Sequence, residues 1–338
     1  MNFDGEDEEE DEIPFIPLHV HDLPQIYTRP PTQDLLSALD LLQKPTSTFG
    51  INPLESKNQA KRTHVDPSGV PRYLTSIIGS SLEWLAEDDQ ERIWELASIR
   101  LSERSGRSAA PAMTRSFKIS DNSTLNLHEP SLTEDNLGLK TWTSSLLLSR
   151  RLAALSKHVP AGRPRILELG SGTGLVGLAA ASTWQDSVSE VMLTDLPEIV
   201  PNLQKNIELN QHMLRGGTPR VHSRVLDWAD MSDVPKSADE TYAVILAADP
   251  IYSAEHPTML TDTVRRWLQP AVSSRFVVEL PLREAYVKER QDLRQRLENF
   301  MDVVEEDEEV GHDDWETADG RQAEVPCWWS VWQWKSPG

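Results

Sequence analysis

The sequence contains a single cysteine, no long apolar run and no concentration of basic side chains. Cys327 is the only thiol among 338 residues, which excludes an internal disulfide and a zinc site built on paired thiolates. No other cluster of metal ligands is visible, so we expect no metal ion. No segment approaches the about 20 consecutive apolar residues that cross a bilayer, and the acidic N-terminus is unlike a signal peptide. We therefore expect a soluble, cytoplasmic or nuclear protein without a membrane segment, and we favour the cytoplasmic location.

The charge balance also limits the partners that the chain can bind. The sequence has 33 Lys and Arg against 54 Asp and Glu, which gives a formal net charge of −21. Direct binding of nucleic acid is not expected, because that affinity comes mainly from basic side chains that neutralise phosphates. A protein partner with a basic surface suits the charge better. We expect a monomer that acts on another protein.

The chain divides by composition into three parts. Residues 1–70 form an acidic, largely disordered tail and linker, which begins with the like-charge block MNFDGEDEEEDE and holds one helical pattern at about 34–43. Residues 71–130 are expected to form N-terminal helices followed by a β-hairpin that turns at Asp121 and Asn122. Residues 131–338 are expected to form the main domain.

Strand and helix patterns alternate through this main domain. The expected strands are 165–169, 190–194, 221–226, 242–248, 274–280, 299–304 and 325–334. The expected helices between them are 142–157, 174–183, 197–211, 257–268 and 283–298. Such alternation predicts an α/β fold with a mostly parallel sheet covered by helices on both faces. The last strand, VPCWWSVWQW, carries tryptophans on both faces and should insert deep into the sheet, whereas residues 305–316 are expected to be a solvated acidic loop.

The segment 165–177, RILELGSGTGLVG, is the most informative motif. A short apolar strand ends in Gly170, Gly172 and Gly174, and a helix-forming run follows, so the turn must bring its backbone close to a ligand. Two nucleotide chemistries use such a turn. The dinucleotide pattern G-x-G-x-x-G is met from Gly172, and the S-adenosylmethionine (SAM) pattern E-x-G-x-G-x-G is met from Glu168. The motif alone leaves both open.

Two later strand ends carry residues suited to a nucleoside. Asp195 closes the second strand, where a carboxylate can accept hydrogen bonds from ribose hydroxyls in either chemistry. Asp227 and Trp228 close the third strand, where an indole can pack against adenine. A dinucleotide oxidoreductase has no assigned use for this pair, which favours SAM.

The fourth strand ends in Asp249-Pro-Ile-Tyr252. In open α/β sheets ligands bind outside the carboxyl ends of the strands, so Asp249 and Tyr252 are expected at the reaction centre. The motif is one residue from the D-P-P-Y of enzymes that methylate planar amide or nucleobase nitrogens, but Ile251 interrupts that slot. It also matches a looser D-x-x-Y. His256, which follows, is interpreted as the start of a helix rather than as a base.

Taken together, these motifs resemble the seven-strand D-x-x-Y lysine methyltransferases, also called methyltransferase family 16. The resemblance covers about residue 129 to the end through NLGLKTW, ILELGSGTGLVG, LTDLPEIVPNLQKNIELN, VLDW and AADPIY in family order. The preceding YLTSIIGSSLEWL and EPSLTEDNLGLKTW look most like the fungal branch that methylates a lysine of translation elongation factor 2.

The resemblance implies a fold, a reaction and a set of site residues. The fold would be the Rossmann-like, seven-stranded class I methyltransferase fold with an N-terminal helical and hairpin appendage. The reaction would be SAM-dependent methylation of a protein lysine, with elongation factor 2 as the expected partner. The implied cofactor contacts are Trp142, Gly170, Ser171, Gly172, Asp195, Trp228 and Ala248. The implied catalytic pair is Asp249 and Tyr252. A methyltransferase of an amide or nucleobase nitrogen and a non-catalytic SAM-binding module remain alternatives.

Overall fold

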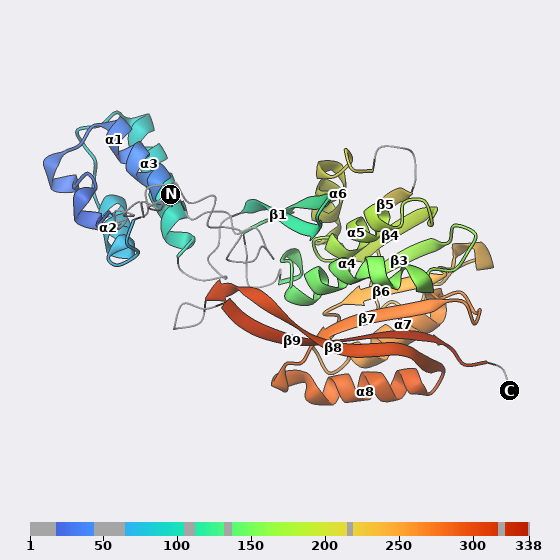
Figure 1. Cartoon of the computed structure of the whole chain (residues 1–338). Coiled ribbons are helices and arrows are strands. Elements are labelled where there is room, and N and C mark those ends of the chain that lie inside the picture. The colour runs from blue at the N-terminus through green and yellow to red at the C-terminus, as the bar shows by residue number, and fades with distance from the viewer. Residues whose placement is uncertain are drawn as a thin grey trace, which may run out of the picture. The chain divides into compact units, whose positions relative to one another are not determined.

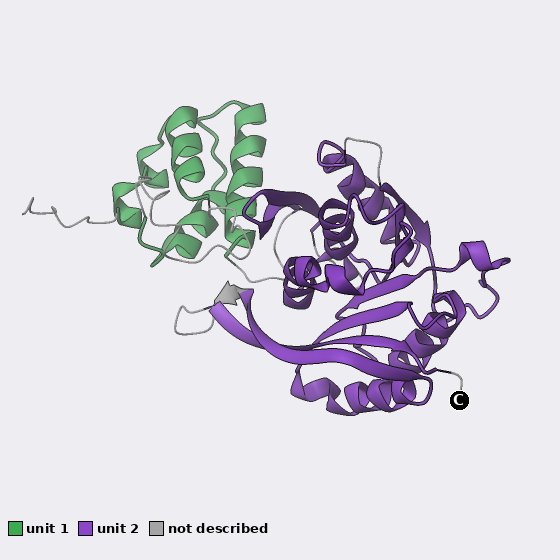
Figure 2. Ribbon diagram, turned by 45° about the vertical axis from the view of Figure 1, so that its right-hand side comes forward, with its two compact units in different colours: residues 1–45, 53–105 green, residues 46–52, 106–338 purple. Residues whose placement is uncertain are grey.

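A computed structural model of the chain describes residues 18–43, 65–104, 112–131, 137–214, 219–316 and 322–336. The chain forms two compact units, one from residues 1–45 and 53–105 and the other from residues 46–52 and 106–338 (Figure 2). The like-charge block at residues 1–12 lies outside the described residues. No helix in the described part of the chain is long and apolar enough to cross a membrane. The same residues contain no group of three or more potential metal ligands.

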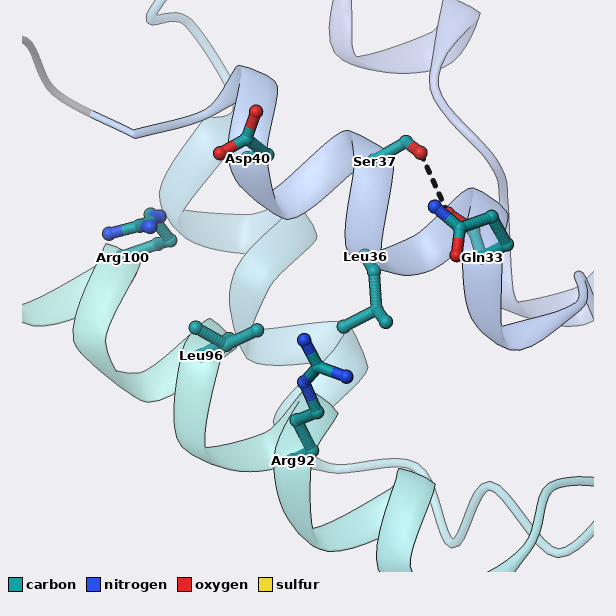
Figure 3. Close-up of a pocket in the computed structure, with 7 residues that line it drawn as sticks. All are labelled: Gln33, Leu36, Ser37, Asp40, Arg92, Leu96 and Arg100. Carbon is teal, nitrogen blue, oxygen red and sulfur yellow. Dashed lines mark hydrogen bonds between the residues drawn. The ribbon is translucent and has the colours of Figure 1, made fainter.

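The first unit is a small helical bundle. Its elements are the 3-10 turns η1 Val20–Asp22 and η2 Ile26–Thr28 and the helices α1 Thr32–Leu41, α2 Val70–Ile78 and α3 Glu87–Ser102. Leu35, Leu74 and Ile93 are fully buried and belong to one apolar core. A groove of about 500 Å³ lies between α1 and α3 (Figure 3). Residues 18–43 therefore contribute an ordered part of this bundle, and the expectation of a largely disordered segment 1–70 is wrong for them, because α1 supplies apolar residues to the core.

The β-hairpin formed by β1 Met113–Ser120 and β2 Ser123–Glu129 belongs to the second unit. The sequence analysis grouped it with the helices of residues 71–105, and that grouping is wrong. Phe117 and Leu127 are fully buried in the core that α4 and α5 share. Asn206 of the helix α6 and Asn210, which directly follows the helix, bind the hairpin backbone. Asn206 Oδ1 accepts the His128 N–H at 2.7 Å, and Asn210 Oδ1 accepts the Asn126 N–H at 2.9 Å. Tertiary packing thus decides where the hairpin belongs.

The second unit is built on a seven-stranded sheet (Figure 1). Its strands are β3 Arg165–Leu169, β4 Glu190–Asp195, β5 Arg220–Val225, β6 Val244–Ala248, β7 Arg275–Pro281, β8 Met301–Glu316 and β9 Gln322–Trp334. They lie in the order β5-β4-β3-β6-β7-β9-β8, and β9 alone runs antiparallel to its neighbours among these strands. The order reverses between β3 and β6, which is the switch point where open α/β sheets bind ligands. The antiparallel insertion confirms the expected hairpin at the C-terminal edge.

Helices cover both faces of this sheet, as the alternating pattern predicted. They are α4 Thr143–Leu155, α5 Leu175–Thr183, α6 Val200–Leu209, α7 His256–Trp267 and α8 Val287–Glu298. In Figure 1, α4, α5 and α6 lie on one face and α7 and α8 on the other. Two apolar clusters result, one under each layer. Val277 and Val278, neighbours in β7, belong to different clusters because successive side chains of a strand point to opposite faces.

The acidic segment 305–316 is part of strand β8, so its assignment to a solvated loop is wrong. Its carboxylates form ion pairs with cations on both sides of the strand. Glu305 pairs with Lys157 and His158, Glu309 pairs with Arg151 of α4, and Glu306 pairs with Arg294 of α8. These ion pairs and the ladder with β9 compensate for a composition that local preference alone assigns to a loop. The prediction that β9 inserts between neighbours is confirmed, with Trp329 and Trp332 buried in opposite clusters.

Candidate active site at the carboxyl edge of the sheet

The turn between β3 and α5 requires glycine for steric reasons. Gly170, Gly172 and Gly174 have φ of +64°, +56° and +85°, a region that side chains rarely adopt. A Cβ added to Gly172 would lie 2.7 Å from the carbonyl oxygen of Gly138, and one added to Gly170 would lie 3.2 Å from Cζ2 of Trp228. The turn is therefore packed between the segment that precedes α4 and the loop that follows β5.

Asp195 connects the end of β4 to this turn. Its Oδ2 accepts the Gly172 N–H at 2.8 Å, and its Oδ1 accepts the N–H of Leu196 at 2.8 Å. Burial raises the pKa of this carboxyl to about 6, against the lowering effect of those two hydrogen bonds. A desolvated carboxylate at the carboxyl edge of the sheet gains from further donors, such as the hydroxyls of a ribose.

Ser171 and Glu168 are buried and connect the turn to β4 and α5 by hydrogen bonds. Ser171 donates its backbone N–H to Thr194 O at 2.9 Å, and its Oγ accepts the Thr194 N–H at 2.9 Å. Glu168 Oε2 accepts the N–H of Gly177 in α5 at 3.0 Å, and burial raises the pKa of this carboxyl to about 8. Both side chains therefore fix the geometry of the turn against β4 and α5.

A buried charged cluster anchors the segment before α4. Glu129, at the end of β2, is fully buried and lies 3.3 Å from the Arg115 guanidinium and 3.2 Å from the Lys140 ammonium. Its Oε1 accepts the Thr141 N–H at 2.9 Å, and the Thr141 hydroxyl bonds the Thr173 hydroxyl of the glycine turn at 2.8 Å. Burial favours a higher pKa for Glu129, but the two cations and Thr141 lower it overall. The hairpin is thereby connected to the turn, a link that the sequence analysis missed.

The loop after β5 contributes Trp228. Its ring is half-buried beside Gly170, and it meets the His256 ring edge to face at a centroid distance of 6.0 Å. Arg266 donates to the Trp228 carbonyl at 3.4 Å and also to the carbonyl of Asp230 at 2.8 Å, which holds the loop to α7. Trp228 therefore forms one wall next to the glycine turn.

Asp249 lies where β6 ends, next to the glycine turn of the adjacent strand β3. It adopts φ of +52°, and its N–H donates to the Glu279 carbonyl of β7 at 2.9 Å. The Arg283 guanidinium donates to Asp249 Oδ2 at 3.1 Å and lies 5.1 Å from the centroid of the Trp142 ring. Trp142 is the residue that precedes α4. Ala248, half-buried, is the last residue of β6.

Tyr252 is the exposed member of this group, with 60% of its surface accessible. Its N–H donates to Nδ1 of His256 at 3.3 Å, and the two rings meet at right angles 4.1 Å apart. Partial burial of the phenol, and then the negative charges of Asp195 and Asp249, raise the pKa of Tyr252. His256 begins α7, as interpreted from the sequence, and burial lowers the pKa of its imidazole.

The structure therefore brings the candidate residues to one edge of the sheet, around the switch point between β3 and β6. Arg283 is a residue of this edge that the sequence analysis missed. The available signal was its position, because Leu282 and Arg283 directly follow strand β7, whose carboxyl end lies at the same edge.

A doubly wound sheet with this order, one antiparallel insertion and a glycine turn at its switch point is the architecture of class I SAM-dependent methyltransferases. The edge fits that cofactor, since a glycine turn with positive φ lies at the switch point and Asp195 offers a desolvated carboxylate beside it. The sheet differs from the six parallel strands of dinucleotide-binding folds, ordered 3-2-1-4-5-6, by the antiparallel strand β9 inserted between β7 and β8. The cofactor is S-adenosyl-L-methionine.

Known proteins resemble the chain over most of its length. A family model described as "Lysine methyltransferase" matches residues 119–307. Protein-lysine N-methyltransferase EFM2 of Saccharomyces cerevisiae is 40% identical over 265 residues, which cover 72% of this chain and 61% of that protein. Protein-lysine N-methyltransferase rrg1 of Schizosaccharomyces pombe is 30% identical over 321 residues, which cover 92% of this chain and 97% of that protein. The chain belongs to the lysine methyltransferase family, and its class is that of the SAM-dependent protein-lysine N-methyltransferases.

Proposed function

We propose that this chain methylates a lysine side chain of translation elongation factor 2. The family and the class of its two yeast relatives support a protein lysine as the acceptor. The choice of elongation factor 2 rests on the resemblance of YLTSIIGSSLEWL and EPSLTEDNLGLKTW to the fungal branch with that substrate. The net charge of −21 suits approach to a basic surface on such a partner. Translation is cytoplasmic, so the proposal includes a cytoplasmic location.

On this proposal the cofactor lies along the ends of β3, β4 and β5. Gly170, Ser171 and Gly172 border its methionine part, Asp195 accepts hydrogen bonds from the ribose hydroxyls, and Trp228 packs against adenine. Two further residues, Trp142 and Ala248, border the methyl end. The supporting observations are the positive-φ glycine turn, the desolvated Asp195 carboxylate and the indole beside Gly170.

The observation that carries the acceptor assignment is the position of Asp249 at the switch point, with Tyr252 exposed beside it. When bound, SAM supplies an electrophilic methyl group on a sulfonium. Asp249 would orient the incoming amine for in-line attack, and Tyr252 would wall the entry channel. The lysine must arrive neutral although its free pKa is about 10.4, so the site has to favour loss of its proton.

The D-P-P-Y alternative finds less support. Enzymes with that motif use the residue at the Ile251 position to hold a flat substrate. Ile251 is only 3% exposed and belongs to the apolar cluster under α7. Its side chain is therefore part of the core and is not presented to a planar nitrogen substrate.

Incubation with radiolabelled SAM and a lysate from cells that lack the endogenous enzyme tests the proposal. We expect one labelled protein of the size of elongation factor 2, with the label on lysine after hydrolysis. A matched incubation with Asp195→Ala should lose the label at limiting SAM. Label on RNA or on glutamine would favour the D-P-P-Y chemistry, and SAM binding without any labelled product would favour a binding module.

A further inference from the structure

Arg283 occupies a position that the reaction as described does not use. It follows β7, and its guanidinium reaches across the strand end to Asp249 Oδ2 at 3.1 Å while it lies over the Trp142 ring. The Asp249 side chain is 8% exposed, whereas that of Arg283 is 39% exposed. The carboxylate is therefore largely buried, whereas the guanidinium is partly exposed to solvent.

A buried carboxylate beside the incoming amine creates a chemical difficulty. Attack on the methyl group requires the neutral amine, but an uncompensated negative charge within about 4–6 Å favours the ammonium form by roughly 1–3 pKa units. An ionised Asp249 without a cation would thus hold the lysine in its unreactive state. The same carboxylate is needed as a hydrogen-bond acceptor for the amine.

We propose that Arg283 resolves this conflict as a charge-compensating positioning residue, which neutralises Asp249 so that the carboxylate orients the substrate lysine without holding it protonated. This inference rests on the proposed function, because it concerns the acceptor of that same reaction. The positive charge of Arg283 also disfavours a second cation nearby, which further promotes the neutral amine.

The other titratable groups around Asp249 do not supply this charge. On β7, Glu279 is fully buried with neither carboxylate oxygen hydrogen-bonded, and burial raises its pKa well above the ordinary value. On β9, burial raises the pKa of the Cys327 thiol. In the loop after β6, the pKa of Tyr252 is raised and that of His256 is lowered. Each of these shifts favours the uncharged form, so none of the four groups supplies a positive charge beside Asp249.

The charged side chains further out are mostly carboxylates or already paired. The negative charge of Glu309 contributes to the raised pKa values of Glu279 and Cys327, and Glu309 is itself paired with Arg151. The negative charge of Glu198 contributes to the raised pKa values of Asp195 and Tyr252. That of Glu255 opposes the lowering of the His256 pKa by burial. Arg283 is the cation that the described contacts bring onto Asp249 itself.

The loop does not depend on the Arg283 side chain for its conformation. Arg290 of α8 donates to the carbonyls of Pro281 at 3.4 Å and Arg283 at 2.5 Å. The Leu282 N–H donates to Pro326 O at 2.7 Å. Since these bonds hold the backbone, replacement of the Arg283 side chain should change the charge at Asp249 and leave the fold intact.

The test compares Arg283→Gln and Arg283→Lys with wild type. Arg294→Gln is the matched control, because Arg294 of α8 is paired with Glu298 of the same helix and with Glu306 of β8, and the change removes the same charge. Single-turnover methylation of elongation factor 2 is measured at saturating SAM from pH 6.5 to 10. For Arg283→Gln we expect the rising limb to move up by about 1 pH unit, a rate about 10-fold lower at pH 7.5, and recovery at high pH. Arg283→Lys should restore most of the profile, and Arg294→Gln should match wild type.

A second measurement is independent of both turnover and the identity of the substrate. Calorimetry at pH 7 with n-butylamine, which is then an ammonium ion and mimics the lysine terminus, probes the acceptor side without cofactor. Arg283→Gln should bind it about 10-fold more tightly than wild type, because the positive charge of Arg283 no longer competes with the ammonium ion for Asp249. SAM affinity should be unchanged in all variants.

Several results would overturn the role of Arg283. These are an unshifted pH profile, a rate loss equal at every pH that Lys does not rescue, or butylammonium binding that is unchanged or weaker. Failure of wild type to methylate elongation factor 2 would refute the proposed substrate instead, and the butylamine measurement would still decide the role of Arg283.

Discussion

The two halves of the site are built differently. The cofactor half is closed and densely hydrogen-bonded. Glu129 is 0% exposed and Ser171 is 7% exposed, and Asp195, Thr141 and Thr173 are each tied to the glycine turn or to the segment beside it. The acceptor half is open. Tyr252 is 60% exposed, and an ion pair of Asp249 with the part-exposed Arg283 spans the strand ends.

This difference matches what each half has to bind. A small cofactor with a fixed shape gains affinity from a site formed in advance, because little side-chain freedom is lost on binding. A protein substrate brings its own surface and excludes water as it docks, so the acceptor half can stay open until then. Removal of a group from the closed half should therefore affect stability and SAM affinity, whereas removal of one from the open half should affect turnover.

The largest effect is expected for Glu129, whose buried carboxylate anchors the cofactor half of the site. Glu129→Ala leaves Arg115 and Lys140 buried without their carboxylate, and breaking a buried pair costs about 3–5 kcal/mol. We expect a fall in unfolding free energy of that size by denaturant titration, together with weaker SAM binding in the folded fraction. Glu129→Gln, which can still accept the Thr141 N–H, should lose less. Unchanged stability in the Ala variant would mean that the cluster does not anchor the turn.

Asp249→Asn should separate the halves most clearly. The change removes the charge but keeps the size, and Asn tolerates the positive φ of this position. We expect a decrease in turnover of about 10²-fold with little change in SAM affinity, as measured by single-turnover methylation and calorimetry. Near-normal transfer would remove Asp249 from catalysis, and an equal loss of SAM binding would assign it to the cofactor half.

Asp195→Ala should show the reverse pattern. It removes the acceptor for two ribose hydroxyls, and lost hydrogen bonds to a charged group typically cost about 1.5–3 kcal/mol, or roughly 10–150-fold in affinity. Turnover at saturating SAM should be largely retained. A folded variant that binds SAM as wild type does would exclude Asp195 from the cofactor site.

The smallest expected effect is a pH dependence confined to the cofactor half. The Asp195 carboxyl has a pKa of about 6 in the cofactor-free protein, above its ordinary 3.8. Ribose hydroxyls bind the ionised form, so SAM affinity should fall by about 10-fold from pH 7 to pH 5, measured by calorimetry. Asp195→Asn should abolish this trend.

The stability of the cofactor-free protein should depend on Asp195 in the opposite direction, since it falls as pH rises whereas SAM affinity increases. Because its folded pKa is raised, its contribution to the stability of the cofactor-free protein is fully present below about pH 3.8 and is lost as pH rises through about 6. Cofactor-free wild type should therefore lose stability relative to Asp195→Asn between pH 5 and pH 7. A constant difference between the two proteins would show that the carboxyl is not desolvated.

Local patterns were sufficient for most of the main unit. The strands and helices from residue 142 onward follow from apolar periodicity, and their alternation predicts the sheet and its switch point. The predicted and observed bounds of β3 coincide at residues 165–169. The patterns failed for β8, because its five consecutive acidic residues at 305–309 are stabilised by cations of α4, α8 and the turn after α4, and these come from elsewhere in the chain.

Local sequence was enough to predict the glycine turn, the order of strands and helices, and the acidic and aromatic residues at the strand ends, because each is encoded within a few neighbouring residues. Long-range packing was needed to reveal three further features: the hairpin packs against α4, α5 and α6, Glu129 joins Arg115 and Lys140 in one buried cluster, and Arg283 pairs with Asp249 across 34 positions of sequence. The physical reason is that buried charges require partners. The partner of each buried charged side chain depends on how elements distant in sequence pack together, so no local pattern predicts it.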